Sequence, residues 1–219
     1  ATMTYEDFVG DGQGKTIGRM EYYKVSPTIA DDIKKDSFWA VFGSLVVVFL
    51  YILLRFRRWQ FSLGAVAAVF HDVVIVLGVF SLTYKFMPFS MEIDQAFIAA
   101  ILTVIGYSLN DTVIVFDRIR EYFGEHPSWK MNRIIDVALS STLSRTLNTS
   151  FTTLIVLLSM FFLGAESIRG LLFAIIVGIL VGTYSSLFIA TPIMYDTVKR
   201  KKVEDLIDKK EEAEPALEA

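Results

Sequence analysis

Long apolar runs separated by short polar segments dominate the chain between residues 38 and 195. A helix needs about 17–25 predominantly apolar residues to cross the roughly 30 Å hydrocarbon core of a bilayer. The predicted fold class is therefore all-α, a polytopic transmembrane helix bundle with five spans. The predicted spans are Phe38–Leu54, Phe61–Tyr84, Gln95–Phe116, Thr142–Leu163 and Leu171–Tyr195.

The segments on either side of the bundle are polar. Residues 1–36 contain several glycines and a short β-like run, Met20–Val25, and we predict that they are the end of an external α+β domain with its linker. The bundle follows at residues 37–198, and the charge-dense tail at residues 199–219 is predicted to be solvated. No signal peptide precedes the first segment and residue 1 is Ala, so we expect further sequence upstream.

Basic residues are concentrated on one side of the predicted membrane. The loops assigned to the other side, Lys85–Asp94 and Gly164–Gly170, hold a single basic residue each. Because Lys and Arg are enriched in cytoplasmic loops, we predict that the N-terminus lies outside and the C-terminus inside. The internal basic residues are Arg55, Arg57, Arg58, Arg118, Arg120, Lys130, Arg133, Lys199, Arg200, Lys201 and Lys202.

Two further patterns concern how the helices pack. The segment Met131–Ser140 has one apolar side, so it is either a short helix at the membrane surface or a cytoplasmic extension of the fourth span. The fifth span and its approach carry Gly170, Ala174, Gly178 and Gly182, small residues at every fourth position. Such a series predicts close packing against another helix.

Composition supports the membrane interpretation and excludes several chemistries. Hydrophobic residues make up 53% of the chain, and the mean hydropathy is +0.50. The absence of cysteine excludes disulfides, thiolate nucleophiles and Cys-based metal sites. His71 and His126 are the two histidines, too few for a zinc site with four closely placed ligands. We therefore predict no cofactor, no metal and no nucleic-acid partner.

The third span carries the first candidate site. Tyr107, Asn110 and Asp111 are spaced i, i+3 and i+4, so they share one helix face, and we predict that they form one buried polar patch. Asp111 lies about six residues, or roughly 9 Å, from the internal end of the span. Because a carboxylate is costly within hydrocarbon, Asp111 is a candidate functional residue.

The fourth span places Arg145 at a similar depth, with Thr142, Thr149 and Thr152 at helical spacing from it. One interpretation is a direct or water-bridged ion pair between Asp111 and Arg145, because each charge stabilises the other at that depth. The alternative is that Arg145 extends along the helix to the membrane interface.

His71 and Asp72 lie near the middle of the second span, about 15 Å from its internal end. Either they form a proton relay, or they serve packing, with His71 bonded to a carbonyl and Asp72 accepting from a Ser or Thr. An aspartyl protease with Asp72 and Asp111 as its dyad is disfavoured, because their estimated depths differ by about 6–7 Å. A dyad that shares a proton needs carboxylates about 3 Å apart. We therefore expect a protein that is not an enzyme.

Four stretches occur in an order that resembles a known family: Leu50–Trp59, His71–Val73, Ile105–Glu121 and Leu143–Ser150. The third reads Ile-Gly-Tyr-Ser-Leu-Asn-Asp-Thr-Val-Ile-Val-Phe-Asp-Arg-Ile-Arg-Glu. Together they resemble the SecF family of protein-export membrane subunits, over about residues 25–195. The resemblance implies a fold of the resistance-nodulation-division (RND) superfamily. SecF-like proteins have six spans and a periplasmic domain, so the chain is similar to the C-terminal part of SecF or of a fused SecD–SecF chain.

The resemblance also implies a function, which is the use of the proton-motive force with SecD to promote late polypeptide translocation across the bacterial inner membrane. In that family the Asp of Asn-Asp-Thr and the Arg of Ser-Arg-Thr are linked to proton movement, and they correspond to Asp111 and Arg145. The implied partners are SecD, SecYEG, the translocating polypeptide, YajC, YidC, protons and membrane lipids. Two alternatives stay open: an RND transporter of small molecules or lipids, and a scaffold of the translocon that conducts no protons.

Overall fold

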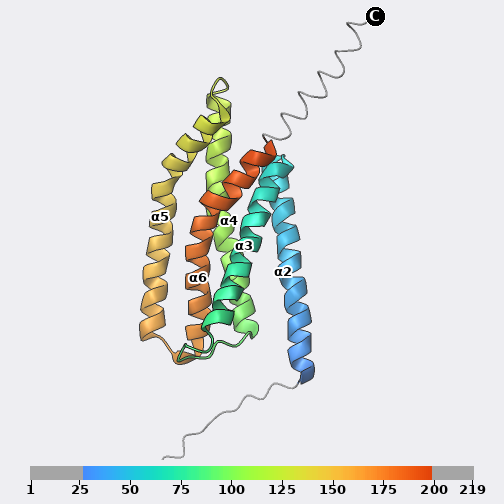
Figure 1. The fold of residues 1–219 in the computed structure, drawn as a ribbon, viewed down its shortest axis with the longest axis vertical. Helices are drawn as coiled ribbons and strands as arrows, with labels where there is room; N and C mark the ends of the chain where they lie inside the picture. The colour runs from blue at the N-terminus through green and yellow to red at the C-terminus, as the bar shows by residue number, and fades with distance from the viewer. Residues whose placement is uncertain (1–26, 199–219) are drawn as a thin grey trace, which may run out of the picture.

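The computed structural model describes residues 27–198, with side chains described from residue 35. The predicted all-α class is confirmed, since every predicted span is a helix long and apolar enough to cross a membrane (Figure 1). The described residues contain no strand, and the predicted segments at residues 1–26 and 199–219 lie outside them. The elements are α2 (Pro27–Phe56), α3 (Trp59–Thr83), α4 (Gln95–Glu125), α5 (Met131–Leu163), η1 (Glu166–Ile168), α6 (Arg169–Ser185) and η2 (Ser186–Ala190), followed by helical residues up to 198.

Three helices are longer than the predicted spans. Helix α2 begins at Pro27 instead of Phe38, and α4 continues through its basic residues to Glu125. Helix α5 begins at Met131, so the segment 131–140 is an extension of the fourth span and not a separate surface helix. Hydropathy marks the hydrocarbon-spanning part of a helix, whereas Lys, Arg and Glu are good helix formers that continue it beyond the membrane.

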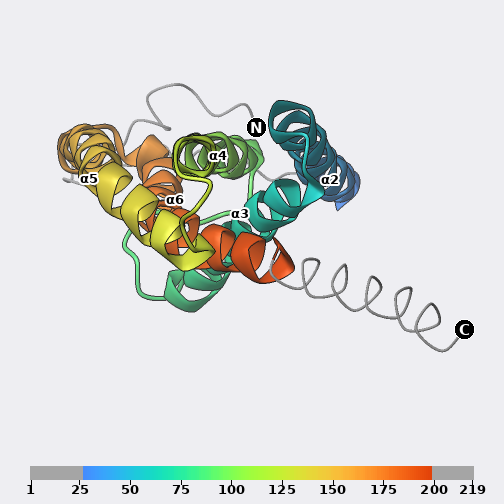
Figure 2. The ribbon, with the colours of Figure 1, turned by 90° about the horizontal axis from the view of Figure 1, so that it is seen from above.

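Helix α4 contacts all four other long helices, α2, α3, α5 and α6, and seen from above it lies between α5 and α2 (Figure 2). Its start is defined by Asp94, whose Oδ1 accepts a hydrogen bond of 2.8 Å from the backbone N–H of Phe97. This bond satisfies one of the amides that a helix N-terminus leaves without an intrahelical partner.

The small residues of α6 pack against α4. A Cβ atom added to Gly178 would lie 2.1 Å from Cγ2 of Val104, and one added to Gly182 would lie 3.0 Å from Cβ of Ser108. The predicted close helix packing is therefore confirmed at these two positions, and the partner helix is α4.

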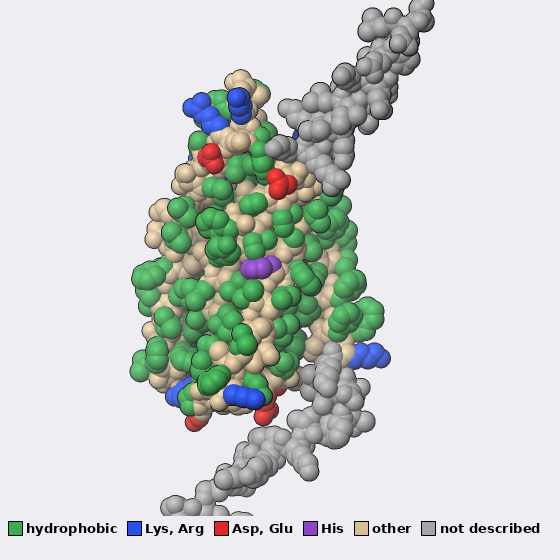
Figure 3. Space-filling model, in the orientation of Figure 1, with side chains coloured by type: hydrophobic (Ala, Val, Ile, Leu, Met, Phe, Trp, Pro, Cys, Tyr) green, Lys and Arg blue, Asp and Glu red, His purple; other side chains and the backbone are tan. Residues whose placement is uncertain are grey.

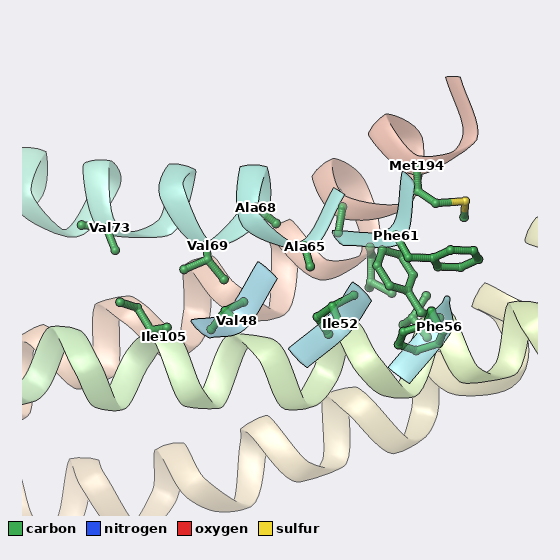
Figure 4. Packing of buried hydrophobic residues seen from close by; sticks show 14 of the residues in the cluster. Val48, Ile52, Phe56, Phe61, Ala65, Ala68, Val69, Val73, Ile105 and Met194 are labelled. Atoms are coloured by element: carbon green, nitrogen blue, oxygen red, sulfur yellow. The ribbon is translucent and has the colours of Figure 1, made fainter. Parts of the chain in front are cut away.

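A short turn through Arg57 and Arg58 joins α2 to α3. Arg57 has a left-handed backbone conformation, with φ of 54°, and its N–H donates to the carbonyl of Leu53 at 2.8 Å. This is a C-terminal helix cap of the kind that glycine usually provides. Next to the turn, buried apolar residues of α2 pack against α3 (Figure 4), and the labelled residues of this contact are Val48, Ile52, Phe56, Phe61, Ala65, Ala68 and Val69.

Beyond this contact α2 diverges from α3 (Figure 1). Phe38, Trp39 and Phe42, in the part of α2 far from the turn, are exposed by 64%, 59% and 50%. At the turn end, Arg55 Nη2 lies 2.8 Å from Oδ2 of Asp117, so an ion pair joins α2 to α4. The face of the bundle seen in Figure 3 is broadly apolar, with charged side chains near its two ends, as expected for a protein surrounded by lipid.

The last span changes direction at η2, which is a π-helical turn (Figure 1). Pro192 follows this turn closely, and it lacks an N–H while its ring clashes with the carbonyl of the residue four positions earlier, Phe188. A widened turn relieves this clash. The hydroxyl of Thr191 donates to the carbonyl of Ser186 at 3.2 Å, which satisfies an acceptor within the turn.

Candidate functional site

Asp111 is completely buried, with 0% of its surface exposed, within the membrane-spanning helix α4. Neither of its carboxylate oxygens has a hydrogen-bond partner among the described residues. A buried carboxylate without partners is costly, so it is stabilised by binding a proton or by the approach of a positive charge. The geometry of Asp111 therefore suits reversible protonation.

Arg145 on α5 is the basic residue predicted to pair with this carboxylate. Its positive charge acts on Asp111 electrostatically, yet no hydrogen bond or ion pair joins the two side chains in the described structure. Arg145 is instead exposed on the outer side of α5. The predicted direct ion pair is thus absent from this state, and the exposed position agrees with the alternative in which Arg145 extends toward the interface.

The buried polar stripe of α5 shares only Thr142 with the threonines at helical spacing from Arg145. The structure buries Thr142, Thr146 and Ser150, which lie one helical turn apart on a single face. Thr149 is half-buried, and its hydroxyl donates to the carbonyl of Arg145 at 2.9 Å. Hydroxyl residues occur on every side of this helix, so the sequence alone does not identify its buried face.

Two contacts complete the polar surroundings on α5 and α6. Ser150 Oγ lies 2.6 Å from Oγ1 of Thr183 on α6. Thr183 Oγ1 also lies within 2.8 Å of the carbonyl of Ile179, to which it donates. Thr146 Oγ1 is buried and has no partner in the described chain. These hydroxyl residues were not predicted as part of the site.

Tyr107 and Asn110 do not join Asp111 in one buried patch, which corrects the prediction. Tyr107 is half-buried, and its hydroxyl lies 3.4 Å from Oγ1 of Thr153 on α5, a long hydrogen bond. Asn110 is exposed. Successive residues of a helix differ by about 100° in direction, so Asn110 lies outside the bundle while Asp111 lies inside it.

A second polar cluster is centred on Asp72 of α3, which is 1% exposed. Its Oδ2 accepts hydrogen bonds from Ser108 Oγ of α4 at 2.6 Å and from Ser185 Oγ of α6 at 2.8 Å. Its Oδ1 lies 3.2 Å from Nδ1 of His71. The packing interpretation therefore has the correct donors for Asp72, which accepts from two serines, but the partner of His71 is this carboxylate and not a carbonyl.

The partners of Asp72 were only partly visible in the sequence. Ser108 was not predicted as a site residue, although it is a hydroxyl residue one helical turn before Asp111 in an apolar span. The bonds of Asp72 go to serines and His71, so Asp72 and Asp111 form no dyad that shares a proton. The described residues also contain no group of three His, Asp or Glu that could hold a metal ion.

The sequence is similar to those of a known protein family. Residues 8–200 match the family described as protein export membrane protein SecD/SecF, C-terminal. The protein translocase subunit SecF of Rhodothermus marinus is 52% identical over 172 residues, which cover 78% of this chain and 56% of the relative. The protein translocase subunit SecDF of Brucella abortus is 44% identical over 78% of this chain and 22% of the relative.

A solved structure has the same fold. The crystal structure of SecDF in its super-membrane-facing form aligns with a TM-score of 0.73 and 35% identity, over 84% of this chain and 24% of the SecDF chain. The chain thus spans about half the length of the curated SecF relatives that it matches.

Proposed function

The chain belongs to the SecD/SecF family of protein-export membrane proteins, and we propose that it is the membrane part of a SecF-type subunit. In this proposal it uses the proton-motive force, together with SecD, to promote late translocation of polypeptides across the bacterial inner membrane. Partnership with SecD is supported by a relative named SecDF. SecYEG, YajC, YidC and the translocating polypeptide are the further proposed partners, and the role is not enzymatic. The basic loops support an external N-terminus and a cytoplasmic C-terminus.

The observation that carries the proposal is the buried Asp111, whose two carboxylate oxygens have no partner among the described residues. When charged, this carboxylate is attracted by the positive charge of Arg145. When protonated, it loses that attraction. Uptake and release of a proton therefore change the force between α4 and α5, which is the elementary step that a proton-driven movement needs.

The proton-motive force supplies enough energy for this step. One elementary charge moved through 100 mV releases about 2.3 kcal/mol, which changes an equilibrium constant roughly fifty-fold. We assign the path near Asp111 to the buried hydroxyls of Thr146, Ser150 and Thr183, while the half-buried Tyr107 and Thr149 border it. His71 and Asp72 lie outside the proposed proton step, because both carboxylate oxygens of Asp72 already bond to His71, Ser108 and Ser185.

The test is export driven by the proton-motive force in membrane vesicles that contain the full-length protein, SecD and SecYEG. Asp111→Asn removes the titratable group and Arg145→Met removes the positive charge. Thr112→Val is the matched control, because Thr112 is equally buried on α4 and its hydroxyl bonds only to the backbone carbonyl of Ser108. Copurification with SecD checks that each variant assembles.

We expect Asp111→Asn and Arg145→Met to assemble normally and to reduce export to the level seen with an uncoupler. Thr112→Val is expected to keep the response to the proton-motive force. If both charge variants keep that response, the proposed coupling is wrong and the chain acts as a scaffold of the translocon. If the proton-motive force drives movement of a small molecule or lipid and has no effect on protein export, the chain belongs to an RND transporter instead.

A further inference from the structure

The α6 residue held by Asp72 stands directly before the π-helical turn. Ser185 ends α6 and donates to Asp72 at 2.8 Å, and η2 begins at the next residue. Ser185 is 0% exposed, so no part of this contact is open to lipid. The carboxylate of α3 therefore fixes α6 at the point where the helix changes direction.

The same carboxylate oxygen also holds α4. Ser108 donates to Oδ2 of Asp72 at 2.6 Å, and it precedes Asp111 by three residues on the same helix face. The two lone-pair positions of this oxygen are thus used by serines from two different helices. We call Asp72, Ser108 and Ser185 the three-helix clamp.

The helical segment that follows Ser185 contacts two other helices of the bundle, α3 and α5. At α3, a Cβ atom added to Gly64 would lie 2.5 Å from the carbonyl oxygen of Ala190, so the two backbones are in close contact. At α5, the hydroxyl of Tyr195 lies 2.5 Å from Oδ1 of Asn132, near the start of that helix. Any change of angle at the π turn therefore moves the internal ends of α3 and α5 relative to each other.

We propose that Asp72 is a positioning residue for the proton-coupled movement. The clamp holds Ser185 to α3 and α4, so a displacement of α4 at Asp111 is passed through Ser108 and Asp72 to the π turn, and from there to the helix that ends at residue 198. This inference rests on the proposed function, since it takes Asp111 as the proton-binding group. Asp72 acts here as a hydrogen-bond acceptor, and the role does not require it to titrate.

The hydrogen bonds of the clamp can be removed one at a time or all together by different substitutions. Asp72→Asn keeps one oxygen with two lone pairs for both serines, and its amide can donate to Nδ1 of His71, so the clamp is preserved without a charge. Asp72→Ala removes the acceptor, and Ser185→Ala removes only the bond to α6. Ser62→Ala is the matched control, because Ser62 is a buried serine of α3 whose hydroxyl has no hydrogen-bond partner in the described chain.

The first measurement is export driven by the proton-motive force, with the full-length protein, SecD and SecYEG. We expect Asp72→Asn and the Ser62 control to keep this response, and Asp72→Ala and Ser185→Ala to lose at least half of it while still copurifying with SecD. If Asp72→Ala fails to assemble, Ser185→Ala carries the comparison. A normal response in Ser185→Ala, or a loss as complete in Asp72→Asn as in Asp111→Asn, would overturn the clamp.

The second measurement follows the helix beyond the π turn directly. Cysteines replace Asn132 and Tyr195 in an otherwise cysteine-free protein, and a short bismaleimide reagent crosslinks them with and without the proton-motive force. We expect a crosslinking yield that depends on the proton-motive force in the parent and in Asp72→Asn, and no such dependence in Ser185→Ala. Equal behaviour of all three contradicts the clamp. Asp111→Asn tests the proposed function separately in the export assay. A failure of the clamp proposal can therefore be distinguished from a failure of the proposed function.

Discussion

Replacement of Gly178 by alanine tests whether the contact between α4 and α6 is as close as the structure shows. The added Cβ would lie 2.1, 2.6 and 2.9 Å from Cγ2, Cγ1 and Cβ of Val104, whereas carbon atoms in contact normally lie about 3.5–4.0 Å apart. Rotation about χ1 moves the two γ carbons but not the β carbon. Valine in a helix also strongly prefers one rotamer. The two helices must therefore separate by at least about 0.6 Å at this point.

Overpacking of this kind costs about 1–3 kcal/mol, and we expect Gly178→Ala to lower the free energy of unfolding by that amount. The measurement is reversible unfolding of the full-length protein in detergent by titration with SDS, with helix content followed by circular dichroism. Gly106→Ala is the matched control, because it adds the same methyl group on α4 where no heavy atom lies within 4 Å.

The double variant Val104→Ala with Gly178→Ala completes the experiment. It removes the two γ carbons that lie nearest to the new methyl group, so we expect it to regain part of the stability lost in Gly178→Ala. If Gly178→Ala is as stable as Gly106→Ala, the helices are not in close contact at this position and the reasoning is refuted.

Two further predictions concern helix ends. Arg57→Gly should raise the free energy of unfolding by about 1 kcal/mol, because a non-glycine residue with a φ of 54° carries a steric cost that glycine avoids; an unchanged or lower thermal midpoint would contradict this. Asp94→Ala should lower the free energy of unfolding by about 1 kcal/mol through loss of the bond to Phe97, while Asp94→Asn should keep it, and equal losses in the two variants would show that the cap contributes nothing.

The number and order of the helices were predictable because the membrane imposes a minimum length on each apolar run. The ends of the helices were harder to predict, as the start of α2 at Pro27 shows. The thickness of the bilayer sets the length of an apolar run, but it does not limit how far a helix continues in polar residues outside the hydrocarbon. The π turn was missed, although Pro192 within the last apolar run was a usable signal.

The candidate site was predictable in its chemistry and less so in its contacts. Burial of Asp111 follows from the cost of a carboxylate in lipid, which acts on this residue alone. The bonds of Asp72 depend on which faces of α4 and α6 meet α3, and a single sequence does not specify that pairing. The sequence leaves two positions open for Arg145, because a long side chain near a helix end can either pair inside the bundle or extend to the interface, and the structure has it exposed.

Helix α2 packs against the bundle at one end only, so it can tilt about that end. Its fulcrum lies near Ile52, which is 0% exposed, while Phe38 and Trp39 have few protein neighbours. The distance along the helix from Ile52 to Pro27 is about 38 Å, at 1.5 Å per residue, so a tilt of roughly 10° displaces the first turn by about 6–7 Å. Such a tilt separates little packed surface, and a small rotation at the turn through Arg57 and Arg58 is thereby amplified at the far end of the helix.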